Sequence, residues 1–101
     1  MKVTLVDSPT STKMFRVIFP DGKHVNFGSR GASDYTINKN QERKRKYLAR
    51  HGASGQDWSS LGIRTAGFWS RWLLWNKTSI SEAKQFITSR FEIIFSSGQA
   101  K

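Results

Sequence analysis

The basic segment ERKRKYLARH, residues 42–51, carries cations at a spacing that suits contact with phosphate groups. In a helix, Arg43, Lys46 and Arg50 occupy positions i, i+3 and i+7 and share one face. Cations on such a face can contact nucleic-acid phosphates, which positions a protein without reading sequence. The alternative is a solvated face on which Glu42 and Lys46 form an ordinary i, i+4 ion pair. The candidate contact residues of the segment are Arg43, Lys44, Arg45, Lys46 and Arg50.

A second candidate surface lies in GIRTAGFWSRWLLWNK, residues 62–77, which holds three of the four tryptophans and three cations. As a helix the segment has two adjacent apolar stripes, which favours burial on two sides and places most of its tryptophans in or near the core. Alternatively, one or two tryptophans, with Trp69 and Trp75 the best candidates, are exposed beside Arg71 and Lys77. Exposed Trp beside Arg is typical of protein hot spots and of surfaces that stack on unpaired bases.

Catalytic chemistry has little support in the sequence. His24 falls in an expected strand, and His51 falls near a helix C-terminus, where the helix dipole is sufficient reason for it. The chain has no cysteine and only seven acidic residues, and no zinc-protease, P-loop or nucleophile-elbow motif occurs. We therefore expect a protein that is not an enzyme, with no catalytic residue, metal site, cofactor or small-molecule substrate.

The charge balance points to a polyanionic or acidic partner. Seventeen Lys and Arg against seven Asp and Glu give a net charge of +10, above the magnitude of roughly 2–8 that suffices to keep a small domain soluble. The candidate partners are nucleic acid, an anionic lipid surface and an acidic protein face; general solubility is the plainer alternative. No stretch approaches the roughly 20 apolar residues that span a bilayer, and the N-terminal apolar run is too short for a signal peptide.

A small α+β domain over residues 1–101 is expected to position these side chains. Phe15, Val17 and Phe19 alternate with other residues before a Pro-Asp-Gly turn, and the alternation resumes at Val25 and Phe27, which predicts a hairpin. With residues 3–6 as a further strand, the hairpin forms a small antiparallel sheet of two or three strands. Two or three helices pack on it, and residues 7–12 and 96–101 are expected to be flexible.

Capping residues predict where the helices begin and end. The helix of the basic segment is expected to start after the N-cap Asn38 and to end at Gly52, a natural C-terminal glycine. Tyr47 is expected to pack on the sheet. Thr65 can cap the tryptophan-rich segment, and Ser79, with a glutamate three residues later, forms a capping box for the last helix. The apolar face of that helix is expected to comprise Ile80, Ala83, Ile87, Phe91 and Ile94.

The succession FGSRGASDYT, RKRKYLARH, Trp58 and GIRTAGFWSRWLLWNK resembles a family of small, basic, uncharacterised proteins of large nucleocytoplasmic DNA viruses, including algal viruses and their giant relatives. The resemblance runs from about Val17 to Asn76, more than half of the chain, and GFWSRWLLWNK is its most specific part. Asn38 and Asn40 stand where the family pattern has His and Asp, and Thr78 stands where it has Pro.

The resemblance implies a viral protein, and we expect it to be made in the host cytoplasm and to be located in the virion. Our leading hypothesis is a structural protein, a minor capsid or cement component that binds other capsid proteins through Trp69, Trp75 and nearby cations. The alternative is a sequence-nonspecific nucleic-acid-binding protein that packages the genome through the basic helix. The run from Arg43 to Lys46 also matches a weak nuclear-localisation pattern.

Overall fold

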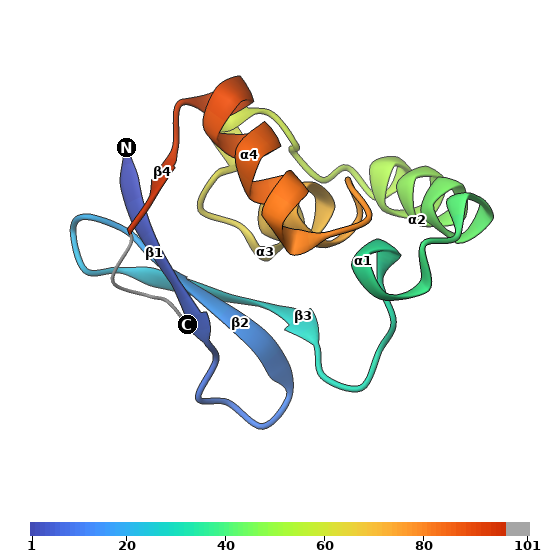
Figure 1. Cartoon of the computed structure of the whole chain (residues 1–101), viewed down its shortest axis with the longest axis horizontal. Helices are drawn as coiled ribbons and strands as arrows, with labels where there is room; N and C mark the ends of the chain where they lie inside the picture. The colour runs from blue at the N-terminus through green and yellow to red at the C-terminus, as the bar shows by residue number, and fades with distance from the viewer. Residues whose placement is uncertain (97–101) are drawn as a thin grey trace.

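A sheet of four strands forms one side of the molecule, and helices lie above it and at its end (Figure 1). The computed structural model describes residues 1–96, and the α+β class predicted from the sequence is confirmed. In chain order the elements are β1 (Lys2–Asp7), β2 (Lys13–Ile18), β3 (His24–Ser29), α1 (Tyr35–Asn38), α2 (Gln41–Ala53), η1 (Ser60–Gly62), α3 (Ala66–Trp69), η2 (Ser70–Leu74), α4 (Ile80–Phe91) and β4 (Ile94–Phe95).

The predicted hairpin is confirmed as β2 and β3. Gly22, at φ +87°, donates its amide to the Phe19 carbonyl at 2.9 Å and so closes the turn, a conformation that glycine adopts without strain. The antiparallel register pairs Val17 with Val25 and Phe15 with Phe27, and the two phenylalanine rings stack 5.7 Å apart. The alternating apolar residues therefore share the face that packs on the helices.

The three predicted strands pair antiparallel, and a fourth strand that was not predicted makes the sheet mixed. Its strand order is β3-β2-β1-β4, with β4 parallel to β1 at the edge. Glu92 ends α4 in a left-handed conformation at φ 57°, and the chain then runs beside β1 (Figure 1). The Ile94 amide donates to the Met1 carbonyl at 2.8 Å. Ile94 therefore belongs to a strand and not, as predicted, to the last helix.

Hydrogen bonds define the conformation of the loop between β1 and β2, in the stretch 7–12 that was expected to be flexible. The Arg30 guanidinium donates to three backbone carbonyl oxygens in and beside this loop, at 2.6 to 3.2 Å. Ser8 is buried and donates through its hydroxyl to the Asn26 side chain at 3.1 Å. Of the second stretch, 96–101, only Ser96 is among the described residues, and its amide donates to the Val3 carbonyl at 2.7 Å.

The core centres on Trp69, which is 0% exposed. Its ring lies 6.4 Å from that of Phe19 and 6.2 Å from that of Phe27, and its indole nitrogen donates to the Ile63 carbonyl at 2.6 Å. The prediction of Trp69 as an exposed interface residue is therefore wrong. The two apolar stripes of its segment are adjacent, and the sequence alone does not say which one faces the sheet.

The tryptophan-rich segment is an α-helical turn that continues as a π-helical turn. Thr65 caps α3 as predicted, by accepting from the Phe68 amide at 3.3 Å. In η2 the Trp75 amide donates to the Ser70 carbonyl, an i to i+5 bond at 3.1 Å, so the turn is wider than in an α-helix. The consecutive residues Leu73 and Leu74 are both buried, whereas Trp72 and Trp75 are half-buried against the core. The prediction that most of these tryptophans lie in or near the core is confirmed.

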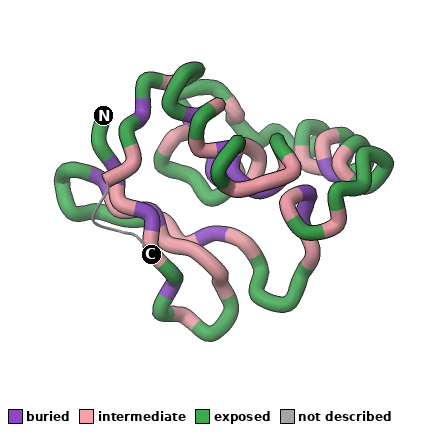
Figure 2. The backbone as a smooth tube through the Cα atoms, in the orientation of Figure 1, coloured by how far each residue is buried: buried purple, intermediate pink, exposed green. Residues whose placement is uncertain are grey.

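Helix α2 lies beside the sheet, and most of its residues are exposed (Figure 2). It starts after Asn40, which accepts from two amides of its first turn, and not after Asn38. The reason is that Asp34 caps a separate short helix, α1, which ends at Asn38. At the other end the helix continues through Gly52, and the left-handed glycine is Gly55, at φ +85°. For α4, the predicted cap Ser79 is confirmed.

Candidate functional site

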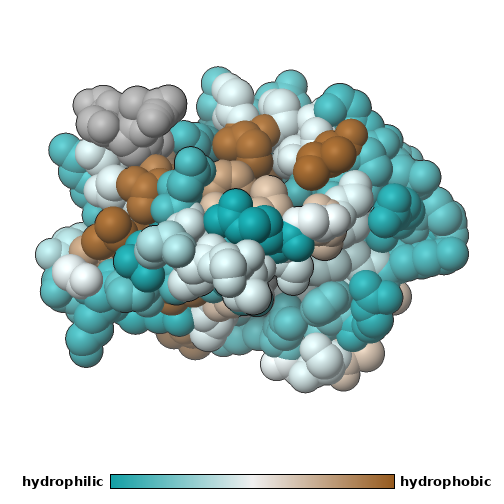
Figure 3. Space-filling view, turned by 90° about the horizontal axis from the view of Figure 1, so that it is seen from below, coloured by the Kyte–Doolittle hydropathy of each residue, from teal (hydrophilic) through white to brown (hydrophobic). Residues whose placement is uncertain are grey.

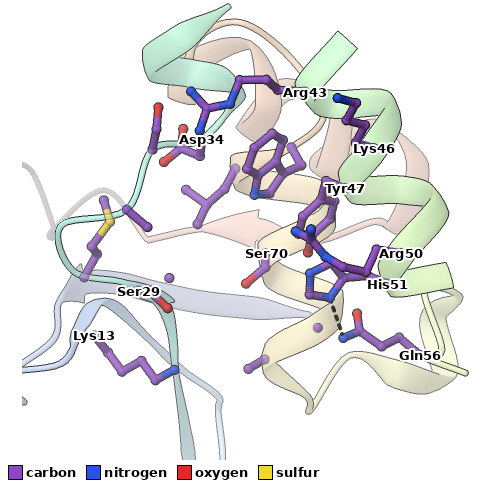
Figure 4. Close-up of a pocket in the computed structure, with 18 residues that line it drawn as sticks. Lys13, Ser29, Asp34, Arg43, Lys46, Tyr47, Arg50, His51, Gln56 and Ser70 are labelled. Atoms are coloured by element: carbon purple, nitrogen blue, oxygen red, sulfur yellow. Dashed lines mark hydrogen bonds between the residues drawn. The ribbon is translucent and has the colours of Figure 1, made fainter. Parts of the chain in front are cut away.

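A cleft of about 700 Å³ lies between α2 and the open end of the β2–β3 hairpin, where β2 begins and β3 ends (Figure 4). One wall is a single face of α2, and the other is formed by the hairpin, the β3–α1 connection, α3 and η2. The lining residues from α2 are Arg43, Lys46, Tyr47, Arg50 and His51. Those from the rest of the chain are Lys13, Met14, Gly28, Ser29, Ala32, Ser33, Asp34, Gln56, Ala66, Gly67, Ser70, Leu74 and Trp75.

The cations of the cleft come from two elements. The structure places Arg43, Lys46 and Arg50 together on the α2 wall, as their spacing predicted, and Lys13 lies across the cleft on β2 (Figure 4). Within residues 1–96, none of these four cations forms an ion pair with a carboxylate. The acidic residue in the lining, Asp34, is 3% exposed and accepts hydrogen bonds from the backbone and side chain of Thr36. The cleft therefore has an excess of positive charge.

Two further cations of the predicted site, Lys44 and Arg45, do not line the cleft. The Lys44 ammonium donates to the Asn76 carbonyl at 2.9 Å and lies 4.9 Å from the centre of the Tyr35 ring. Burial, followed by the charges of Arg71 and Lys77, lowers the pKa of Lys44. Arg45 pairs with Glu42, so the alternative pairing of Glu42 with Lys46 does not occur. Both cations therefore make contacts within the protein.

Arg71 and Lys77 belong to a cation–aromatic ladder, which consists of Lys77, Phe86, Trp72, Arg71 and Trp58. The Arg71 guanidinium lies 4.2 Å from the ring centre of Trp72 and 5.5 Å from that of Trp58, and it donates to the Trp75 carbonyl at 3.0 Å. Trp72 stacks on Phe86 at 5.3 Å, and the Lys77 ammonium lies 5.3 Å from the Phe86 ring. Arg71 and Lys77 therefore both contact aromatic rings of the protein itself.

Aromatic rings form the base of the α2 wall. Tyr47 is buried and stacks on Trp75 at 4.6 Å and on His51 at 4.2 Å, so it packs on these rings and not on the sheet. Burial raises the pKa of Tyr47 to about 12, although the charges of Arg71 and Arg50 act in the opposite direction. The phenol is therefore protonated at neutral pH. Trp75, the second predicted interface aromatic, is half-buried in the lining of the cleft.

Hydrogen bonds determine the tautomer of His51. An indole nitrogen is only a donor, so the Trp58 indole donates to Oε1 of Gln56, at 3.1 Å. The amide nitrogen Nε2 of Gln56 is then the donor to Nδ1 of His51, also at 3.1 Å (Figure 4). His51 is therefore neutral and carries its proton on Nε2. Neither this neutral state of His51 nor its contact with Gln56 was predicted from the sequence, because the helix dipole already explained a His near a helix end.

Replacing Gln56 by alanine is expected to raise the pKa of His51. Burial, and then the charge of Arg50, lower this pKa from its ordinary value of 6.5, and the bond from Gln56 favours the same neutral form. The pKa of His51 is measured by NMR titration, with His24→Gln to assign the two histidines. The contradicting result is an unchanged or lower pKa in Gln56→Ala.

The same lowered pKa makes stability depend on pH. Well above pH 6.5 His51 is neutral in both the folded and the unfolded state. As the pH falls, the unfolded state takes up the proton first, so stability falls until the pH passes the pKa of the folded state. Between pH 7.5 and 5.5 the urea midpoint of the wild type should therefore fall more than that of His51→Gln.

A family of unknown function, DUF5754, matches residues 3–51 of this chain. The chain is similar to that family from β1 through most of α2, which includes all four cations of the cleft. The tryptophan-rich segment lies outside the matched residues. No curated protein and no solved structure matches the chain.

The surface at the α2 end of the molecule is mainly hydrophilic, and hydrophobic side chains appear as separate patches elsewhere on the face seen from below (Figure 3). Within residues 1–96, no helix has the length and apolar character needed to cross a lipid bilayer. In the same part of the chain, no cluster of three His, Asp or Glu side chains is placed to hold a metal ion.

Proposed function

We propose that the protein binds nucleic acid without sequence preference, through phosphate contacts made at the cleft. The observation that carries this proposal is the set of four cations, Lys13, Arg43, Lys46 and Arg50, which line one cleft and have no carboxylate partner among the described residues. Contacts between such cations and phosphates release counterions and supply essentially all of the free energy of nonspecific binding. The net charge of +10 acts in the same direction over the whole surface.

The spacing of the α2 cations suits a nucleic-acid backbone. From Arg43 to Arg50 the helix rises about 10.5 Å, at 1.5 Å per residue. One strand of a duplex carries a phosphate roughly every 3.4 Å along its axis, so this face spans roughly three phosphates. The cations on it are mainly exposed, so a phosphate can approach them without a change of fold.

Fewer observations support the capsid hypothesis than support binding of nucleic acid. Its interface consisted of Trp69 and Trp75 with nearby cations, but Trp69 is in the core and Arg71 is in the cation–aromatic ladder. Leu61 is 88% exposed, but single apolar residues are normal on a protein surface. The capsid role, its capsid-protein partners and the virion location stay predictions that rest on the resemblance.

The proposal is tested by neutralising three cations of the cleft. In the variant Arg43→Gln/Lys46→Gln/Arg50→Gln, we expect the slope of log affinity against log salt concentration to decrease by about 3, because each lost phosphate contact removes about 1. The measurement is fluorescence anisotropy of a labelled random-sequence DNA across a salt series.

The control variant, Lys2→Gln/Lys23→Gln/Arg90→Gln, removes the same net charge from exposed positions outside the cleft. Its salt slope should stay within about 1 of the wild type. If both variants lose affinity equally, the binding comes from overall charge and the cleft is not the site.

A further inference from the structure

We infer that the cleft takes an unpaired base, so that the protein binds single-stranded nucleic acid more tightly than duplex. This inference rests on the proposed function and adds the kind of strand that is bound. Phosphate contact alone requires only the cations at the surface of α2. The volume, the aromatic rings and the polar groups of the cleft also suit a base.

The cleft is large enough for a nucleotide. Its volume of about 700 Å³ lies within the roughly 300–1,000 Å³ of typical small-molecule sites. Small residues on the wall opposite α2 leave this space open: Ser29, Ala32, Ser33 and Ser70. At Gly67 a Cβ would lie 2.6 Å from Oε1 of Gln56, so even one added carbon disturbs the network that orients His51. A base that is paired and stacked in a duplex cannot enter such a space, whereas an unpaired base can.

The aromatic residues of the cleft suit a base. The indole of Trp75 is half-buried, lines the cleft, and is held in one orientation by its stacking on Tyr47 at an interplanar angle of 7°. Stacking of a base on an aromatic ring tolerates any sequence, because every base has a π-face. An indole that is already fixed loses little conformational freedom when a base binds.

Polar groups beside the indole can bind the edge of a base. The bond from Gln56 leaves the proton of His51 on Nε2, where it is a donor for a carbonyl or ring nitrogen of a base. The hydroxyl of Ser70 lies on the opposite wall. Lys46 and Arg50 lie beside Tyr47 and His51 on the α2 wall (Figure 4). The cations can therefore hold the phosphates of a strand whose base is inside the cleft.

The inference is tested on the wild-type protein with three DNA probes of equal length: a single strand of thymidines, an abasic single strand and a duplex. The abasic strand has the same phosphates without the bases. We expect the thymidine strand to bind at least about tenfold more tightly than the abasic strand, and more tightly than the duplex.

The outcomes separate the two proposals. If the thymidine and abasic strands bind equally and both depend on the cleft cations, the inference is overturned and the proposed function stands. If none of the probes binds at about 150 mM salt, both are overturned.

A pair of variants tests the role of the indole. Trp75→Leu is expected to weaken binding of the thymidine strand about tenfold and to leave the abasic strand unchanged. Phe86→Leu is the control, because Phe86 is also a half-buried aromatic residue, stacks on Trp72 and does not line the cleft. Its ratio of thymidine to abasic affinity should equal that of the wild type, and an equal loss in both variants contradicts a base-binding role for Trp75. The wild-type comparison decides the inference even where Trp75→Leu loses its fold.

Discussion

Replacing Trp69 by alanine is expected to lower the free energy of unfolding by about 3–5 kcal/mol, as for other large aromatic residues removed from a core. The ring is fully buried and contacts two strands of the sheet, through Phe27 of β3 and Phe95 of β4, as well as its neighbour Phe68. The loss is a large fraction of the roughly 5–15 kcal/mol that stabilises a typical domain. The measurement is urea denaturation, followed by circular dichroism.

Two controls separate burial from other effects of losing this tryptophan. Trp69→Phe keeps an aromatic ring and removes the donor to the Ile63 carbonyl, so its loss should be smaller than that of Trp69→Ala. Trp58→Ala removes a half-buried tryptophan outside the core cluster and should also cost less. If Trp69→Ala has the stability of the wild type but fails to assemble with a partner, Trp69 is an interface residue after all.

The parts of the fold that the sequence predicted are those that local patterns determine. The hairpin follows from alternation around a turn that ends in Gly22, and the caps Thr65 and Ser79 follow from a side chain placed before a helix. The shared face of Arg43 and Arg50 follows from helical periodicity alone. In each case, the residues that interact are close in the chain.

The parts that were missed depend on contacts between distant residues. Lys13 reaches the cleft because β2 begins there, across from α2, and nothing near Lys13 in the sequence indicates this. The burial of Trp69 depends on which of two apolar stripes faces β3. The two residues of β4 pair with β1 from the opposite end of the chain, so their strand has almost no local signal.

Replacing Arg71 is expected to cause the second large loss of stability. Its guanidinium stabilises the fold and is not expected to contact a partner. In Arg71→Met the side chain is about as long, but the contacts with Trp58 and Trp72 and the bond to the Trp75 carbonyl are lost. We expect a loss of about 2–3 kcal/mol in the free energy of unfolding, from a charged hydrogen bond and partly buried cation–π contacts. Arg71→Lys should lose less, because an ammonium can reach the carbonyl but cannot stack on the indoles as a planar guanidinium does.

The nucleic-acid binding of the same variants tells the two roles of a cation apart. Arg71→Met should keep the salt slope of the wild type under conditions in which it is folded, whereas each cation removed from the cleft lowers the slope by about 1. A slope that falls by about 1 with unchanged stability would place Arg71 on a phosphate and extend the binding surface from α2 to η2. An unchanged salt slope with reduced stability would mean that the cations of this chain have two different roles, which depend on where each cation lies. Those on one face of α2 would then contact the partner, and the one between the indoles would hold the tryptophan-rich segment together.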